Sequence, residues 1–138
     1  NDSAAACEYF EKASTGLDEP SGVLYYNDQP SDTILYQGLA NEELGNTAAA
    51  KKCYHQLLAF GKKHIFDEVT YDYFAVSLPE IEVFPDNIKE RNDIYCRYLM
   101  ALGHIGLGEK DEADALLHEI LQLKADYQGA IRHLPMTE

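Results

Sequence analysis

Two stretches of the sequence, residues 31–64 and 94–127, repeat the same order of glycine, small and apolar residues at a constant offset of 63 positions (108 − 45). The matched pairs are Gly38 with Ala101, Gly45 with Gly108, Ala50 with Ala113, Tyr54 with Leu117, and Leu57 with Ile120. A pattern that recurs at a fixed offset indicates repeated units that bury their apolar faces by stacking on each other. We therefore expect two similar structural units.

The second stretch has the pattern of a helical hairpin. Its apolar residues recur at helical spacing on both sides of a glycine-rich stop, namely Tyr95, Tyr98, Leu99, Leu102 and Ile105, then Ala113, Leu117, Ile120 and Leu121. Of the glycines at 103, 106 and 108, Gly108 lies where a tight turn needs a positive φ. The small residues at Gly38 and Ala101, and at Ala50 and Ala113, predict that the two helices of each unit approach closely.

A third, partial copy opens the chain, where Ala6, Phe10 and Ala13 follow the Ala-x3-Phe-x2-Ala signature of a second repeat helix. In residues 4–14, 31–64 and 94–127 the sequence resembles the tetratricopeptide repeat family, a helix-turn-helix unit of about 34 residues. The resemblance implies an all-α fold, in which hairpins stack into a right-handed α-α superhelix. Three family positions differ: the tryptophan is Ile34 and Arg97, the first-helix tyrosine is Asn41 and His104, and the closing proline is Lys62 and Ala125. Two unrelated hairpins in an ordinary helical bundle are the alternative.

Turn and capping residues predict the element boundaries. We expect helices over residues 3–14, from Ser31 or Asp32 to Leu44, from Asn46-Thr47 to about Lys63, and from Asp86 or Asn87 to about Leu107. A capping helix over 127–133 is expected to stop at Pro135. Residues 65–93 form an aromatic-rich insertion or a degenerate unit, with a short helix over 69–77 that Pro79 ends. Residues 1–138 then make one domain, divided into 1–16, 31–64, 65–93, 94–127 and 127–134.

The chain is expected to be a fragment of a longer protein, because it lacks an initial Met and opens within a repeat. The segments YYNDQP, YQGLA, DYFAVSLPEIEVF and ALGHIGLG resemble the C-terminal repeat region of large bacterial tetratricopeptide proteins. In those proteins a β-rich domain of unassigned function precedes the repeats. That resemblance implies no activity for this piece.

The net charge of −13 argues against nucleic acid and anionic membranes as partners. No apolar run reaches the roughly 20 residues of a membrane helix. The charge is uneven, because residues 36–66 hold four lysines and two acids whereas residues 1–35 hold seven acids and one base. A basic or neutral partner and plainly solvated faces both fit this distribution. The three cysteines, Cys7, Cys53 and Cys96, lack a CxxC pair and favour semi-buried thiols in a reducing compartment such as the cytoplasm.

Motifs for chemistry are missing. The five histidines lack HExxH or His-x3-His spacing, and neither a phosphate-binding glycine loop nor GxSxG occurs. We therefore expect no metal, no cofactor and no enzymatic activity.

Binding is the function that the resemblance implies. In this family the first helices of successive units line a concave groove, which places there Leu35, Leu39, Glu42, Glu43, Tyr95, Tyr98, Leu102 and Ile105. The Lys and Asn of the family's carboxylate clamp are absent, since Leu35, Tyr98, Leu39 and Leu102 hold those positions. An apolar or aromatic peptide is thus expected rather than an acidic C-terminus. Alternatively, these side chains contact the inserted segment 65–93.

Three hypotheses on function remain at this point. The first is a protein-interaction or scaffold module that holds a peptide or another domain of the same polypeptide. The second is a structural spacer or self-association module with no ligand of its own, which uses apolar faces exposed at the open repeat ends. The third, a small-molecule or enzymatic site around the tyrosines, is the least favoured.

Overall fold

A computed structural model describes residues 3–22, 29–68 and 87–138. Their regular elements are α1 (Ser3–Ala13), α2 (Thr33–Glu43), α3 (Thr47–His64), α4 (Ile88–Leu107), α5 (Lys110–Leu123), α6 (Gln128–His133) and the 3-10 helix η1 (Leu134–Met136). Every regular element in these ranges is helical, which confirms the all-α prediction. The short helix expected over residues 69–77 lies outside the described residues.

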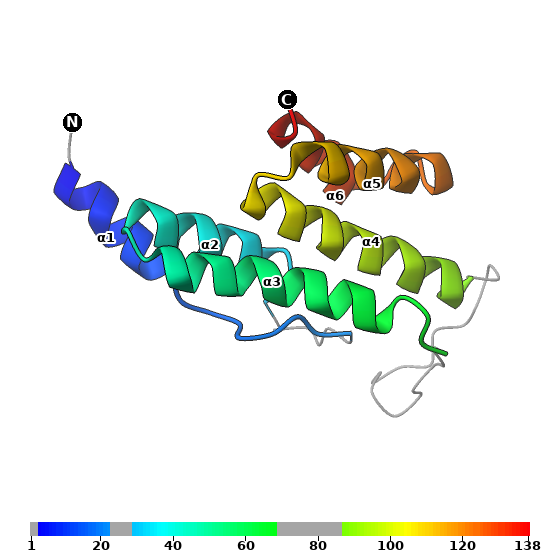
Figure 1. Cartoon of the computed structure of the whole chain (residues 1–138), viewed down its shortest axis with the longest axis horizontal. Helices are drawn as coiled ribbons and strands as arrows, with labels where there is room; N and C mark the ends of the chain where they lie inside the picture. Colours follow the sequence, from blue (N-terminus) through cyan, green and yellow to red (C-terminus); the bar gives the residue numbers. More distant parts are fainter. Residues whose placement is uncertain (1–2, 23–28, 69–86) are drawn as a thin grey trace.

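The helices α2 to α5 stack in chain order (Figure 1). Helix α3 packs along both its hairpin partner α2 and the next helix, α4, and α5 packs on α4. Helix α2 also touches α4 directly, so the first helices of the two hairpins are neighbours. The short α6 lies against α5 and α4, whereas α1 extends beyond the stack and contacts α2.

The two hairpin turns use glycine in the same backbone conformation. Gly45 has φ 77° and Gly108 has φ 74°. Both lie in the left-handed region, which is strained for residues that have a Cβ atom. The positive φ predicted for Gly108 is confirmed, and its amide caps α4 by donating to His104 and Ile105 carbonyls. Both turns therefore end a helix in the same way, 63 residues apart.

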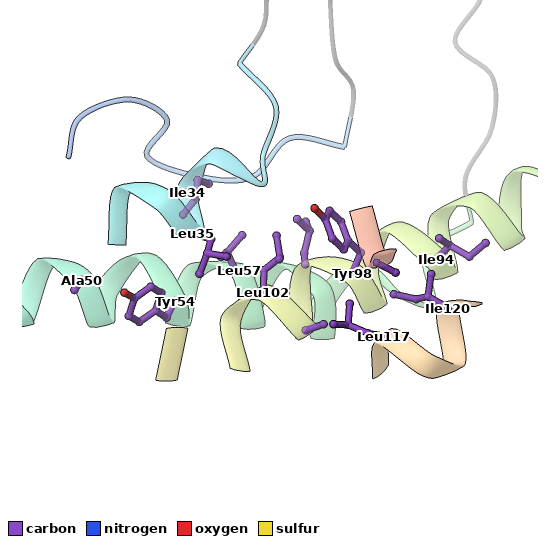
Figure 2. Packing of buried hydrophobic residues seen from close by; sticks show 13 residues of the cluster. Ile34, Leu35, Ala50, Tyr54, Leu57, Ile94, Tyr98, Leu102, Leu117 and Ile120 are labelled. Atoms are coloured by element: carbon purple, nitrogen blue, oxygen red, sulfur yellow. The ribbon is translucent and has the colours of Figure 1, made fainter. Parts of the chain in front are cut away.

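The core contains the residues that the repeat pattern pairs. Ala50 and Ala113, Tyr54 and Leu117, and Leu57 and Ile120 are all fully buried. Figure 2 shows the side chains of Tyr54, Leu57, Leu117 and Ile120 in the space between α2, α3, α4 and α5. The predicted close approach within a hairpin is also present, since a Cβ atom on Gly38 would lie 2.2 Å from Cε1 of Tyr54.

The capping predictions differ in outcome. Asn87 caps α4 as expected, because its side chain accepts a hydrogen bond from the Glu90 amide at 3.2 Å. The prediction that Ser31 or Asp32 caps α2 is wrong, since neither side chain accepts from a free amide of that helix. Both side chains instead make tertiary hydrogen bonds, described below, which hold separate segments together.

The N-terminal helix is the least enclosed element. No residue of α1 is buried: Ala6 and Ala13 are exposed and Phe10 is half-buried. Semi-buried thiols were predicted throughout, yet only Cys53 fits this description, because Cys7 is exposed and Cys96 is buried. Burial, with help from Asp67 and Asp93, raises the pKa of the Cys96 thiol to about 11.

The capping helix predicted over 127–133 is present as α6, which ends at His133, and the 3-10 helix η1 follows it directly. Pro135 does not end the helical geometry but lies in the first turn of η1, where its missing N–H costs no hydrogen bond. The tail is tied to α5, because the Thr137 hydroxyl donates to the Asp114 carboxylate at 3.1 Å and Lys110 binds the Glu138 carbonyl. No helix within the described ranges is long and apolar enough to cross a membrane.

Candidate interaction face

Seven of the eight predicted groove residues fall into two groups in the structure. Leu35 and Leu102 are fully buried, and Tyr98 is 5% exposed. These three side chains hold α2, α3 and α4 together, as Figure 2 shows, so a bound segment cannot reach them without separating the helices. These three residues belong to the hydrophobic core and not to an accessible surface.

The other group lies at the surface of α2 and α4. Helix α2 buries most of its residues. A stripe on its outer side runs through the exposed Tyr36, the half-buried Leu39 and the exposed Glu43 at helical spacing, with Glu42 beside it. On α4, the half-buried Ile105 lies three residues beyond Leu102, on the same side of the helix. We call the residues Tyr36, Leu39, Glu42, Glu43 and Ile105 the α2–α4 face.

The eighth residue, Tyr95, is engaged by the segment that precedes α2. Its hydroxyl donates to the Ser21 carbonyl at 2.6 Å and lies 2.7 Å from the Ser31 hydroxyl, which also accepts from the Ser21 amide at 3.0 Å. Burial raises the pKa of Tyr95. These bonds close a small ring that fastens the segment around Ser21 onto α4.

The same segment is fastened to α2. The Gln37 amide, with its NH2 toward the Leu17 carbonyl, donates there at 3.1 Å and accepts from the Leu17 amide at 3.0 Å. Asn41 donates to the Ser14 carbonyl at 3.3 Å. Buried side-chain amides thus pair with the backbone of residues 14–21, which explains why polar residues occupy the interior side of α2.

A buried histidine joins three helices. The imidazole of His133 on α6 lies 2.9 Å from the Tyr36 hydroxyl through Nε2 and 3.1 Å from the Tyr98 hydroxyl through Nδ1. Because Nδ1 also lies 2.8 Å from the Gly129 carbonyl, which only accepts, we place the proton on Nδ1. Nε2 then accepts from the Tyr36 hydroxyl. One fully buried side chain therefore links α2, α4 and α6.

The Tyr98 hydroxyl completes this cluster. It lies 3.4 Å from the Asp32 carboxylate, to which it donates, and Arg132 approaches the same carboxylate at 4.0 Å. Burial and the nearby Asp32 carboxylate raise the pKa of Tyr98. Asp32, at the start of α2, therefore faces α4 and α6 instead of its own helix.

Close packing also fits α6 to Tyr98. The Tyr127 ring meets the Tyr98 ring edge-on with centroids 5.3 Å apart. A Cβ atom on Gly129 would lie 2.7 Å from Cζ of Tyr98, so only glycine permits this approach. Helix α6 thus covers the part of the surface next to Tyr36 and leaves Leu39, Glu43 and Ile105 accessible to different degrees.

The polar groups of this region make structural hydrogen bonds. The hydroxyl groups of Tyr36, Tyr95 and Tyr98 and the His133 imidazole pair with one another or with backbone. In the part of the chain that the structure describes, no group of three or more His, Cys, Asp or Glu side chains could hold a metal ion.

Sequence reasoning missed Tyr36, His133 and Asp32 as members of this region. The spacing of the repeats contained a signal for two of them. His133 follows Leu99 by one unit of 34 residues (133 − 99), and Tyr36 precedes Leu99 by the 63-residue offset (99 − 36). The three residues hold the same position of successive first helices. This register predicts that residues 127–133 form a further first helix, next to that of residues 94–107.

A comparison with known protein families also indicates a helical repeat. Residues 32–59, which include α2 and most of α3, match the tetratricopeptide repeat family model. No solved structure matches the chain. Together with the stacked hairpins, the match identifies the fold as a tetratricopeptide-like helical repeat array. Repeats of this family generally mediate protein–protein interaction or scaffolding.

Proposed function

We propose that this chain is a non-catalytic interaction module of a larger bacterial protein and that it binds a peptide or a neighbouring domain through the α2–α4 face. The observation that carries the proposal is the stripe on α2. Leu39 is a half-buried apolar residue, flanked by Tyr36 with 41% of its area exposed and by the exposed Glu43. Core packing accounts for the other side of α2 and for only part of this stripe, since Leu39 is half-buried against the core whereas Glu43 is exposed.

The composition of the face indicates the chemistry of its ligand. Tyr36, Leu39 and Ile105 offer aromatic and aliphatic area, which favours an apolar or aromatic side chain. Glu42 and Glu43 add two exposed carboxylates within one helical turn of Leu39. They favour a basic residue next to the apolar one and disfavour an acidic C-terminus.

Selection of peptides followed by charge reversal tests this proposal. A displayed peptide library is selected on the folded chain, and the affinity of the recovered peptide is then measured for Glu42→Lys/Glu43→Lys. The matched control is Glu11→Lys/Glu68→Lys, which changes the net charge by the same amount at exposed positions of α1 and the segment after α3. We expect a roughly tenfold weaker affinity for the first variant only. An equal loss in both variants, or no recovered peptide, contradicts the proposal.

Self-association is a second candidate, favoured by the exposure of apolar residues on α1. The repeat-like residues Ala6, Phe10 and Ala13 lie on this helix without any being buried, and Tyr9 is 69% exposed. Two such surfaces meeting would bury apolar area that the isolated chain leaves in water. Light scattering tests this candidate: a dimer that Phe10→Glu converts to a monomer supports it, and a monomer at high concentration excludes it.

A further inference from the structure

The outer side of α3 carries a basic face. Five of its exposed side chains are basic and lie within one third of the helix circumference, namely Lys51, Lys52, His55, Lys62 and Lys63. Only the exposed Ala48 and Ala59 lie among them, and the helix contains no acidic residue. We call these five residues the basic face of α3.

The lysines of this face have no ion pair among the described residues, although acids outnumber bases in the chain by 24 to 11. Among the other cations of the described chain, Lys12 pairs with Glu8, and Arg97 pairs with Asp93 and Glu119. Lys62 and Lys63 lie in the last turn of α3, where the helix dipole favours them. The dipole does not account for Lys51 and Lys52, which lie near the other end.

We propose that the basic face of α3 is a second interaction surface, which binds an acidic segment of a protein. From residue 51 to residue 63 the face is about 18 Å long, which matches about 13 residues of a helical partner. The small side chain of Ala59 lies between the lysine pairs and lets the backbone of the partner approach. Carboxylates at the spacing of the lysines would each meet a cation that has no carboxylate partner among the described residues.

The size of the face and its surroundings favour a short acidic segment over an extended polyanion. Exposed acids lie on both sides of α3 along the chain: Glu42 and Glu43 on α2, and Glu68 in the segment after α3. A DNA duplex or a flat anionic membrane extends well beyond 18 Å and beyond a Debye length of about 8 Å, so it meets this negative charge as well. A peptide confined to the basic face of α3 does not meet these acids.

The probe for this proposal is a labelled helical peptide of about 13 residues with glutamates at the spacing of the lysines, and its control is the same peptide with glutamine at those positions. Affinity is measured by fluorescence anisotropy for the unaltered chain, for Lys51→Glu/Lys62→Glu and for Lys89→Glu/Lys124→Glu. The two variants have the same net charge, and Lys89 and Lys124 are exposed residues outside α3. Circular dichroism establishes that all three proteins are folded.

We expect the glutamate peptide to bind and the glutamine peptide not to bind. Lys51→Glu/Lys62→Glu weakens binding roughly tenfold, and the variant outside α3 weakens it less than about twofold. Lys51→Arg/Lys62→Arg retains binding, because it keeps the charge. An equal loss in the two reversal variants overturns the proposal, as does tighter binding of a DNA duplex or of phosphatidylserine vesicles.

Discussion

The ring of Tyr54 on α3 lies against the backbone of Gly106 on α4, where a Cβ atom would be only 2.1 Å from Cδ1 of the ring. Gly38 on α2 borders the same ring. A tyrosine thus fills the space between α2 and α4, and two glycines make room for it. This contact fixes how closely the second hairpin approaches the first.

Replacement of Gly106 by alanine should destabilise the fold by about 2 kcal/mol, because the added methyl group overlaps the Tyr54 ring. Chemical denaturation measures the change. In a Tyr54→Leu background the cost should shrink, since the smaller side chain leaves room. An unchanged cost in that background would place the strain elsewhere.

Replacement of Tyr54 by phenylalanine should leave stability unchanged or raise it by about 1 kcal/mol. The Tyr54 hydroxyl is buried and has no hydrogen-bond partner in the part of the chain that the structure describes. Its removal therefore relieves the free-energy cost of burying an unpaired hydroxyl. Burial first, and then the Glu42 carboxylate, raises the pKa of this phenol. Tyr36→Phe is the matched control and should lower stability by about 1 kcal/mol, because its hydroxyl bonds to His133. A loss of stability in Tyr54→Phe refutes the expectation.

Replacement of His133 by phenylalanine should cost about 2 kcal/mol and loosen α6. The change leaves the Tyr36 and Tyr98 hydroxyls without their shared partner. Hydrogen exchange should rise first in residues 128–133. His118→Phe, at an exposed position of α5, should change stability by less than about 0.5 kcal/mol. Equal effects of the two substitutions would show that the buried cluster does not hold α6.

Stability should fall steeply in alkali. Burial raises the pKa of Tyr127 to about 12, against about 10 in an unfolded chain. Because the folded state favours the protonated phenol, this contribution is complete below pH ~10 and is lost as the pH rises through about 12. Tyr127→Phe should reduce the slope of unfolding free energy against pH in that interval. A slope equal to that of the unaltered protein would argue against burial of this ring.

The three thiols should react with an aromatic disulfide reagent at different rates. Cys7 is exposed and should react first, whereas Cys96 is buried and its raised pKa reduces the thiolate fraction. Mass spectrometry of partly labelled protein identifies the order. Early labelling of Cys96 would contradict the packing of α3 on α4.

The repeat pattern predicted much of the fold because it records which positions are buried. Gly45, Gly108, Ala50 and Ala113 serve purposes that each unit needs by itself, namely a turn and a close approach. The need for Gly106 was not predictable in this way. At the offset of 63 its counterpart is Glu43 (106 − 63), and only the large Tyr54 ring from another helix requires a glycine there.

The candidate site was predicted less well than the fold. Helical spacing places Leu35 and Leu102 on the same side as Leu39 and Ile105, but it does not say how deeply neighbouring helices cover each one. The caps expected of Ser31 and Asp32 failed for a similar reason. Tyr95 and Tyr98, distant in the sequence, bind these two side chains in the folded chain.

Chemical-shift mapping with the peptide selected on this chain tests the central proposal most directly. On addition of the peptide, the resonances of Leu39, Glu43 and Ile105 should shift together, with one binding curve, while those of α1 and α5 stay in place. Shifts confined to α1 or α5, or no shifts on α2 and α4, would contradict binding at the α2–α4 face.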